Sequence, residues 1–269
     1  MVTGKEADAF LPLLRRRVPR EGALIVHSAI ARLSRQGYRA EAMIESFLDH
    51  LRDGHLFMPT MTWRTVTLDR PHWDEIATPS HTGILTEVFR TQYAATRSVH
   101  PTHSVAGFGK DAPRLLARHH IDDTPVSANS PYGLLRDYDT HILTIGVGLE
   151  CVTAIHLPEE ITNVDLYVRP RSQAELYHCR DRAGTVHDVY TRRHWRLDRD
   201  FNQFAPALQA DGALEVGVID GCPYTIVSLR DLLRHVFAAL EQNPAATLSA
   251  KARAKGTDLT PSESSARPS

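Results

Sequence analysis

The amino-acid sequence predicts an α/β (α+β) fold, built as a single domain with a mixed central sheet flanked by helices. Three observations predict it. The chain has 269 residues, of which 42% are hydrophobic and 23% charged, an ordinary composition for a globular domain. Short apolar runs alternate with amphipathic segments in the first half of the chain. In the second half, strand-like segments follow one another as a meander.

The first half alternates helical and strand-like segments. Residues 23–26 form a continuous apolar run, which is typical of a buried strand, and residues 40–51 carry apolar side chains at helical spacing. Ser130 precedes a proline and is expected to cap a short helix. We expect further strands over 56–61 and 140–147, and further helices over 5–19, 82–90, 111–119, 131–136 and 152–160.

The second half is richer in alternating apolar and polar residues, which predict strands. Residues 243–269 contain no aromatic residue and many small or polar ones, which is typical of disorder. We therefore expect one domain over residues 1–242 and a disordered tail over 243–269 that is dispensable from residue 246. The strands expected before this tail cover 164–168, 174–178, 185–191, 214–219 and 224–227, and the helices cover 198–208 and 229–240.

Charge and cysteine content limit the functional class. Lys and Arg total 31 and Asp and Glu total 32, a formal net charge of -1, whereas nucleic-acid binders usually carry a basic excess. No apolar run approaches the roughly 18 residues of a membrane helix, and the first ten residues lack the apolar core of a signal peptide. Three widely spaced cysteines fit a reducing compartment. We expect a cytoplasmic protein that binds neither nucleic acid nor membrane.

His156 and Glu159 are the sharpest local candidates for chemistry. They are three residues apart near the end of a predicted helix, so they share a helix face. A carboxylate beside an imidazole fixes its tautomer and raises its basicity, as a general base requires. Two such residues more often form a surface ion pair, so the pattern alone leaves both interpretations open.

Two polar segments are further candidates. Residues 97–104 mix a guanidinium, hydroxyls and imidazoles between predicted elements, and such a loop can bind phosphate or line a pocket. His100 and His103 could also bind metal, and an ordinary solvated turn stays open. His27 and Ser28 follow a buried strand, where the N–H groups of a starting helix favour an anion or a carbonyl, although a plain cap is more common.

Several catalytic motifs are absent from the sequence. It contains no H-E-x-x-H, no cysteine pair at zinc spacing, no phosphate-binding P-loop and no G-x-S-x-G. Cys222 has no local partner and is expected to be a small buried residue. We therefore expect no bound metal.

Taken together, these segments resemble the aminoglycoside 3-N-acetyltransferases, the antibiotic acetyltransferase family. The family's motifs occur in matching order and spacing from about residue 8 to residue 242. The last and longest of them places Thr153, His156 and Glu159 at the family's positions. The matching segments are V-H-S-A at 26–29, M-P-T at 58–60, an approximate match at 78–90, R-S-V-H-P-T-H-S at 97–104, S-P-Y-G-L-L at 130–135 and residues 143–159.

The resemblance implies an enzyme that transfers acetyl from acetyl-CoA directly to an amine. His156 would be the general base, Glu159 would hold its tautomer and support the imidazolium, and Thr153 would stabilise the oxyanion. It also implies two groups of residues that contact CoA. His27 and Ser28 would line the pantetheine and thioester, and the CoA-side polar loop would comprise Arg97, Ser98, His100 and Ser104.

The sequence indicates the acceptor amine less clearly than it indicates the reaction. An aminoglycoside is a polycation, and the carboxylates expected around it are Glu150, Asp165, Asp198 and Asp200, each of which could equally be a surface charge. The expected partners are a small-molecule amine and CoA, and a homodimer is left open. Three alternatives remain: acyl transfer to a non-aminoglycoside amine in small-molecule biosynthesis, a metal-dependent hydrolase using His100, His103 and His156, and a non-catalytic binding protein.

Overall fold

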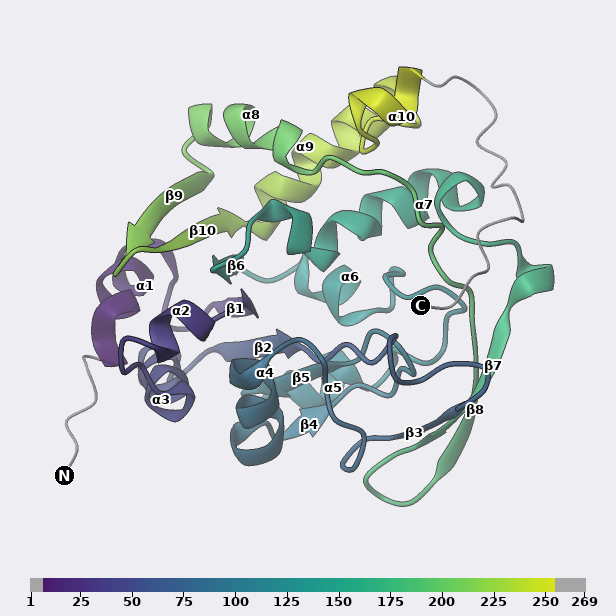
Figure 1. Ribbon diagram of the computed structural model, residues 1–269, viewed down its shortest axis with the longest axis horizontal. Helices are drawn as coiled ribbons and strands as arrows, with labels where there is room; N and C mark the ends of the chain where they lie inside the picture. Colours follow the sequence, from purple (N-terminus) through teal and green to yellow (C-terminus); the bar gives the residue numbers. More distant parts are fainter. Residues whose placement is uncertain (1–6, 255–269) are drawn as a thin grey trace.

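A seven-stranded mixed sheet forms the centre of the computed structural model, which describes residues 7–254 (Figure 1). The strand order is β4-β5-β2-β1-β6-β10-β9. β1 pairs in parallel with β2 and β6, and the outer pairs are antiparallel. The strands are β1 (Ala23–Ser28), β2 (His55–Pro59), β4 (Thr96–Arg97), β5 (Val105–Phe108), β6 (Thr140–Ile145), β9 (Leu214–Ile219) and β10 (Cys222–Ser228).

Helices cover both faces of this sheet, because β1 is apolar on both. Leu24 and Val26 point into one buried cluster, whereas Ala23 and Ile25 point into the other. Successive side chains of a strand alternate between faces, so a continuous apolar run needs cover on each. The helices are α1 (Leu11–Arg17), α2 (Ala31–Ser34), α3 (Ala40–His50), α4 (Ile84–Val88), α5 (Ala112–Leu116), α6 (Pro131–Leu135), α7 (His156–Tyr167), α8 (Ala205–Ala210), α9 (Leu229–Gln242) and α10 (Ala250–Ala254).

A smaller three-stranded sheet lies at one side of the domain, on the right of Figure 1. Its strands are β3 (His72–Asp74), β7 (Glu175–Arg180) and β8 (Val186–Thr191). Trp73 and Tyr177 fill a separate small core beneath it. The predicted single α/β domain with a mixed sheet is confirmed. Across residues 7–254, no helix has the length and apolar character needed to span a membrane.

Three local predictions need correction. The helix expected over 152–160 begins instead as a 3-10 turn, Thr153–Ile155, and continues as α7 to Tyr167, so His156 stands at the start of the helix. The strand expected over 164–168 is therefore wrong. A short apolar run is ambiguous between strand and buried helix, and here the residues pack against the core as helix. The helix expected from residue 198 begins only at Asn202.

The predicted disordered tail is also wrong for residues 243–254. Ala246, Thr247 and Leu248 are buried, and Leu248 forms a β-bridge with Arg199. Composition predicted disorder because the segment has no apolar periodicity, but one leucine and one threonine suffice to fill a space beside α7. Residues 255–269 of the predicted tail lie outside the described residues.

Replacing Leu248 with alanine tests this packing. The side chain is fully buried, so Leu248→Ala is expected to lower the free energy of unfolding by about 2–5 kcal/mol, the usual cost of such a cavity. Urea denaturation measures the change, and Lys251→Ala at an exposed site is the matched control. Equal stability of the two variants would contradict the described packing.

Candidate functional site

A pocket of about 750 Å³ opens at the carboxyl ends of β1, β2 and β6. The carboxyl ends of parallel strands are the usual ligand site of α/β sheets, because the chain leaves the sheet there in loops. The loop after β2 and the start of α4 form a second wall. Residues lining the pocket include His27, Ser28, Pro59, Met61, Trp63, Arg64, His81, Gly83, Ile84, His103, Val147, Glu150, Val152, Thr153 and His156.

A glycine turn brings the chain from β6 into the pocket wall. Gly146 has φ +70, in the left-handed region that favours glycine. A Cβ there would lie 2.4 Å from the carbonyl oxygen of Ala29. The close approach of these two backbones holds the segment leading to Thr153 and His156 against the end of β1.

His156 and Glu159 form the hydrogen-bonded pair that their spacing predicted. Nδ1 of His156 lies 2.7 Å from Oε2 of Glu159. The His156 side chain is 19% exposed and lines the pocket, whereas that of Glu159 is fully buried. Because Nδ1 faces the carboxylate, Nε2 is the nitrogen left to exchange a proton with a ligand.

Glu159 is held by donors from distant parts of the chain. Nε of Arg199 donates to both carboxylate oxygens, at 3.0 and 3.1 Å, and Oγ1 of Thr247 donates to Oε1 at 2.5 Å. Burial by itself would raise the pKa of Glu159, but His156 and Arg199 outweigh it and lower the pKa. Glu159 is therefore ionised at neutral pH, and its charge would stabilise an imidazolium that forms on His156. Sequence reasoning missed Arg199 and Thr247, since neither belongs to a motif.

His27 and Ser28 lie on the pocket wall, and their contact with CoA, which the family resemblance implies, stays a prediction. Nε2 of His27 and Oγ of Ser28 are buried and have no hydrogen-bond partner among the described residues. Burial lowers the pKa of His27 to about 4, so the ring is uncharged at neutral pH. Buried polar atoms without partners are rare in proteins, which distinguishes these two atoms from the paired polar groups around them. Thr153, also buried, lines the same wall near His156.

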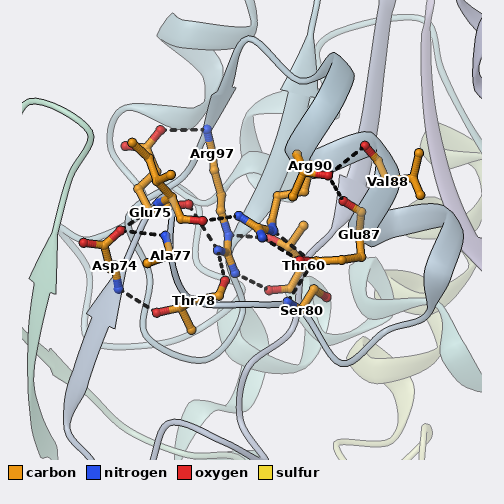
Figure 2. Close-up of polar contacts among 12 residues, drawn as sticks. Thr60, Asp74, Glu75, Ala77, Thr78, Ser80, Glu87, Val88, Arg90 and Arg97 are labelled. Carbon is orange, nitrogen blue, oxygen red and sulfur yellow. Dashed lines mark hydrogen bonds and ion pairs between the residues drawn. The ribbon is translucent and has the colours of Figure 1, made fainter.

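The polar loop 97–104 is used differently from the prediction. Arg97 is 3% exposed, and Figure 2 shows its guanidinium directed toward Thr60 and Thr78. Nε donates to Thr60 Oγ1 and to Ser104 Oγ, both at 3.0 Å, and Nη1 donates to the Thr78 carbonyl at 2.6 Å. The guanidinium also lies over the Trp73 ring, 4.8 Å from its centre. Arg97 therefore ties the loop after β2 to β4, and it has no surface for a phosphate.

Ser98, His100 and Ser104 are likewise buried and do not line the pocket. Ser98 contacts Nδ1 of His119 at 2.8 Å, and Nδ1 of His100 accepts backbone N–H groups of the same loop. The predicted CoA contacts of these three residues and of Arg97 are contradicted by this burial. From this loop His103, predicted only as a metal ligand, lines the pocket. Among residues 7–254, no cluster of three or more His, Cys, Asp or Glu could hold a metal ion.

The four carboxylates predicted to bind the acceptor all lie within residues 7–254. Of these four, Glu150 alone lines the pocket. Asp165, Asp198 and Asp200 are exposed elsewhere on the surface. Asp198 accepts a hydrogen bond from the hydroxyl of Ser249 at 2.8 Å, so it anchors the C-terminal segment. The structure thus brings His27, Ser28, Thr153, His156 and Glu150 together and separates the other acidic candidates from them.

A family model described as aminoglycoside 3-N-acetyltransferase matches residues 25–241. The chain belongs to this family. A curated protein similar to this chain is the SPbeta prophage-derived aminoglycoside N(3')-acetyltransferase-like protein YokD of Bacillus subtilis (strain 168), which is 25% identical to it over 157 residues. That match covers 51% of this chain and 57% of the relative, little more than half of its length.

Solved structures of aminoglycoside acetyltransferases share the fold. The apoenzyme of AAC(3)-IVa has a TM-score of 0.73 at 20% identity, covering 97% of this chain and 98% of its own. The crystal structure of YokD has a TM-score of 0.71 at 19% identity, covering 91% and 96%. AAC-IIIb, solved as a binary complex with CoASH, has a TM-score of 0.71 at 18% identity, covering 88% and 97%.

The structural role of Arg97 can be separated from a CoA-binding role. Arg97→Met removes a buried guanidinium and leaves its acceptors unpaired, so the free energy of unfolding is expected to fall by about 3 kcal/mol. The KM for acetyl-CoA is expected to stay unchanged in the folded variant. Denaturant titration and steady-state kinetics measure the two, with Arg136→Met at an exposed site as the control. A raised KM without loss of stability would restore the CoA interpretation.

Proposed function

We propose that the protein is an acetyl-CoA-dependent N-acetyltransferase in which His156 is the general base. The observation that carries the proposal is that His156 lines the pocket while its Nδ1 contacts the buried, ionised Glu159. Membership of the aminoglycoside 3-N-acetyltransferase family supports the reaction class. The same fold in AAC-IIIb with CoASH supports CoA as the carrier of the acetyl group.

The proposed chemistry follows from the protonation of His156. An amine can attack a thioester carbonyl only through a free lone pair, so its proton must pass to a base as the nitrogen–carbon bond forms. Nε2 of His156 accepts that proton, and Glu159 stabilises the resulting imidazolium. When the carbon–sulfur bond breaks, the imidazolium returns the proton to the leaving thiolate. Atoms and charges balance without a metal, oxidant or covalent acyl-enzyme.

The other pocket residues fit a thioester and its developing charge. The unpartnered Nε2 of His27 and Oγ of Ser28 supply polar contacts for uncharged groups of pantetheine and thioester. The Thr153 hydroxyl is proposed to donate to the carbonyl oxygen as negative charge develops on it, because a fixed donor in a dry site stabilises an oxyanion strongly. These residues bind and orient, while His156 moves the proton.

Removing the imidazole tests the base. His156→Ala is expected to lower kcat by about 10²–10⁴, the usual contribution of a general base, and to leave acetyl-CoA affinity nearly unchanged. Thiol release measures turnover and calorimetry measures binding of acetyl-CoA. His178→Ala is the control, since that histidine pairs with Asp188 at 2.7 Å outside the pocket. Wild-type turnover by His156→Ala at pH 7 would refute the mechanism.

The acceptor has two candidates. Family membership favours an aminoglycoside-type amine. The pocket lining favours the alternative, an amine with fewer positive charges, because Glu150 is the one carboxylate of the predicted four that lines it. Arg64 lines the same pocket and lies over Trp63, 4.8 Å from the ring centre. A polycation gains little from a pocket in which one guanidinium offsets one carboxylate.

An acceptor panel separates the two candidates. Thiol release from acetyl-CoA is measured with several aminoglycosides and with simple amines. Glu150→Gln is expected to raise the acceptor KM by about twofold to fivefold and to leave the acetyl-CoA KM unchanged, since Glu150 is exposed and an exposed ion pair contributes about 0.2–1 kcal/mol. The exposed Asp165→Asn is the matched control. Turnover of simple amines but of no aminoglycoside would exclude the aminoglycoside-type acceptor and support an amine with fewer positive charges.

A further inference from the structure

A second histidine–glutamate pair lies directly against the proposed base. Glu159 and Glu160 are consecutive on α7, and each contacts a different histidine at 2.7 Å: Glu159 contacts His156, and Glu160 contacts Nε2 of His194. The two imidazole rings stack, with centres 4.4 Å apart and planes tilted by 33°. The mechanism above uses the first pair and leaves the second without a role.

His194 is held in place from several directions. Its backbone forms a β-bridge with Val168 at the end of α7, and the next residue, Trp195, donates its N–H to the Tyr167 carbonyl. The Glu160 side chain is 2% exposed, and the backbone N–H of Val126 donates to both of its oxygens, at 2.9 and 3.0 Å. The ring orientation of His194 is therefore determined by fixed backbone and a buried carboxyl group.

The groups facing this pair favour an uncharged His194. Burial, together with the charges of His156 and Arg199, lowers the pKa of His194 well below its usual value, and His103 and His100 act in the same direction. Burial raises the pKa of Glu160 to about 8, although Thr124, Val126 and Arg192 oppose the shift and Glu159 adds to it. Near pH 7 the Glu160–His194 pair therefore carries no net charge.

We propose that His194, held by Glu160, is a positioning residue that presents an uncharged ring to His156. The proposal rests on the proposed function of His156 as the base. A positively charged neighbour at this distance would repel the imidazolium that forms on His156, whereas a neutral ring does not. The stacked ring also limits rotation of His156, and small errors in the position of a base are costly in rate.

The two glutamates then differ in what they do to His156. Glu159 is ionised and acts through its charge, which stabilises the imidazolium formed on His156 during the reaction. Glu160 acts through its hydrogen bond to His194, and near neutral pH it adds no charge. The same chemical change at adjacent positions, glutamate to glutamine, is therefore expected to affect the pKa of His156 at one position and not at the other.

The kinetic test varies the ring at position 194. His194→Ala is expected to lower kcat about tenfold or more, as for a displaced base, with little change in the KM for acetyl-CoA. His194→Phe retains a neutral ring and is expected to regain most of the lost turnover. His187→Ala is the matched control, because His187 also contacts a carboxylate, Asp181 at 2.8 Å, and stacks near another imidazole, His120 at 4.9 Å.

The second test needs no turnover. NMR titration of the His156 ring gives its pKa in Glu159→Gln and Glu160→Gln. The first variant is expected to lower that pKa because it removes a contacting charge, and the second is expected to leave it unchanged because an amide replaces an uncharged acid. An equal drop in both variants would overturn the proposed division of roles.

The outcomes separate this inference from the proposed function. If the wild type acetylates no amine, the proposed function fails, and the titration still decides whether Glu160 is uncharged beside the stack. If the wild type is active but His194→Ala matches it, or if His194→Phe is as impaired as His194→Ala, the positioning role of His194 is refuted. Should His194→Ala fail to fold, the turnover of His194→Phe still tests the positioning role of His194. The titration then still tests the division of roles between Glu159 and Glu160.

Discussion

Burial of one ionised carboxylate, Glu159, organises the proposed catalytic side of this molecule. A charge without contact to water is costly unless donors surround it. Three donors do so, from α7 itself, from the segment before α8 and from the chain after α9. Arg199 and Thr247, which are distant from Glu159 in the sequence, therefore both contact its side chain on α7. The C-terminal segment is part of the site for this reason.

The same requirement explains why much of the polar sequence is architectural. Arg97, Ser98 and Ser104 look suited to a ligand, yet their polar atoms are paired inside the protein. A loop that crosses the interior has to pair its own polar groups, and hydroxyls and a guanidinium do this well. The residues left to meet a ligand are those with unpaired atoms at the strand ends, His27 and Ser28 among them.

Family membership and pocket chemistry constrain different parts of the proposed function. The family match supports the reaction class and covers residues 25–241, a stretch that includes the His156–Glu159 pair on α7. Acceptor choice depends instead on side chains of the pocket wall, where Arg64 and Glu150 oppose each other in charge. Because fold and acceptor contacts are carried by different residues, one scaffold can serve different amines.

Local sequence patterns were enough to predict the α/β class, the two-sided burial of β1, the Ser130 cap and the pairing of His156 with Glu159. Each follows from local periodicity or from spacing along one helix turn, which short-range geometry controls. Three other features became apparent only in the folded chain: Arg97 is internal, residues 243–254 are packed, and His194 stacks on the proposed base. These contacts join residues far apart in the chain, such as Glu159 and Thr247. Local sequence patterns do not predict which distant donor will pair with a buried charge.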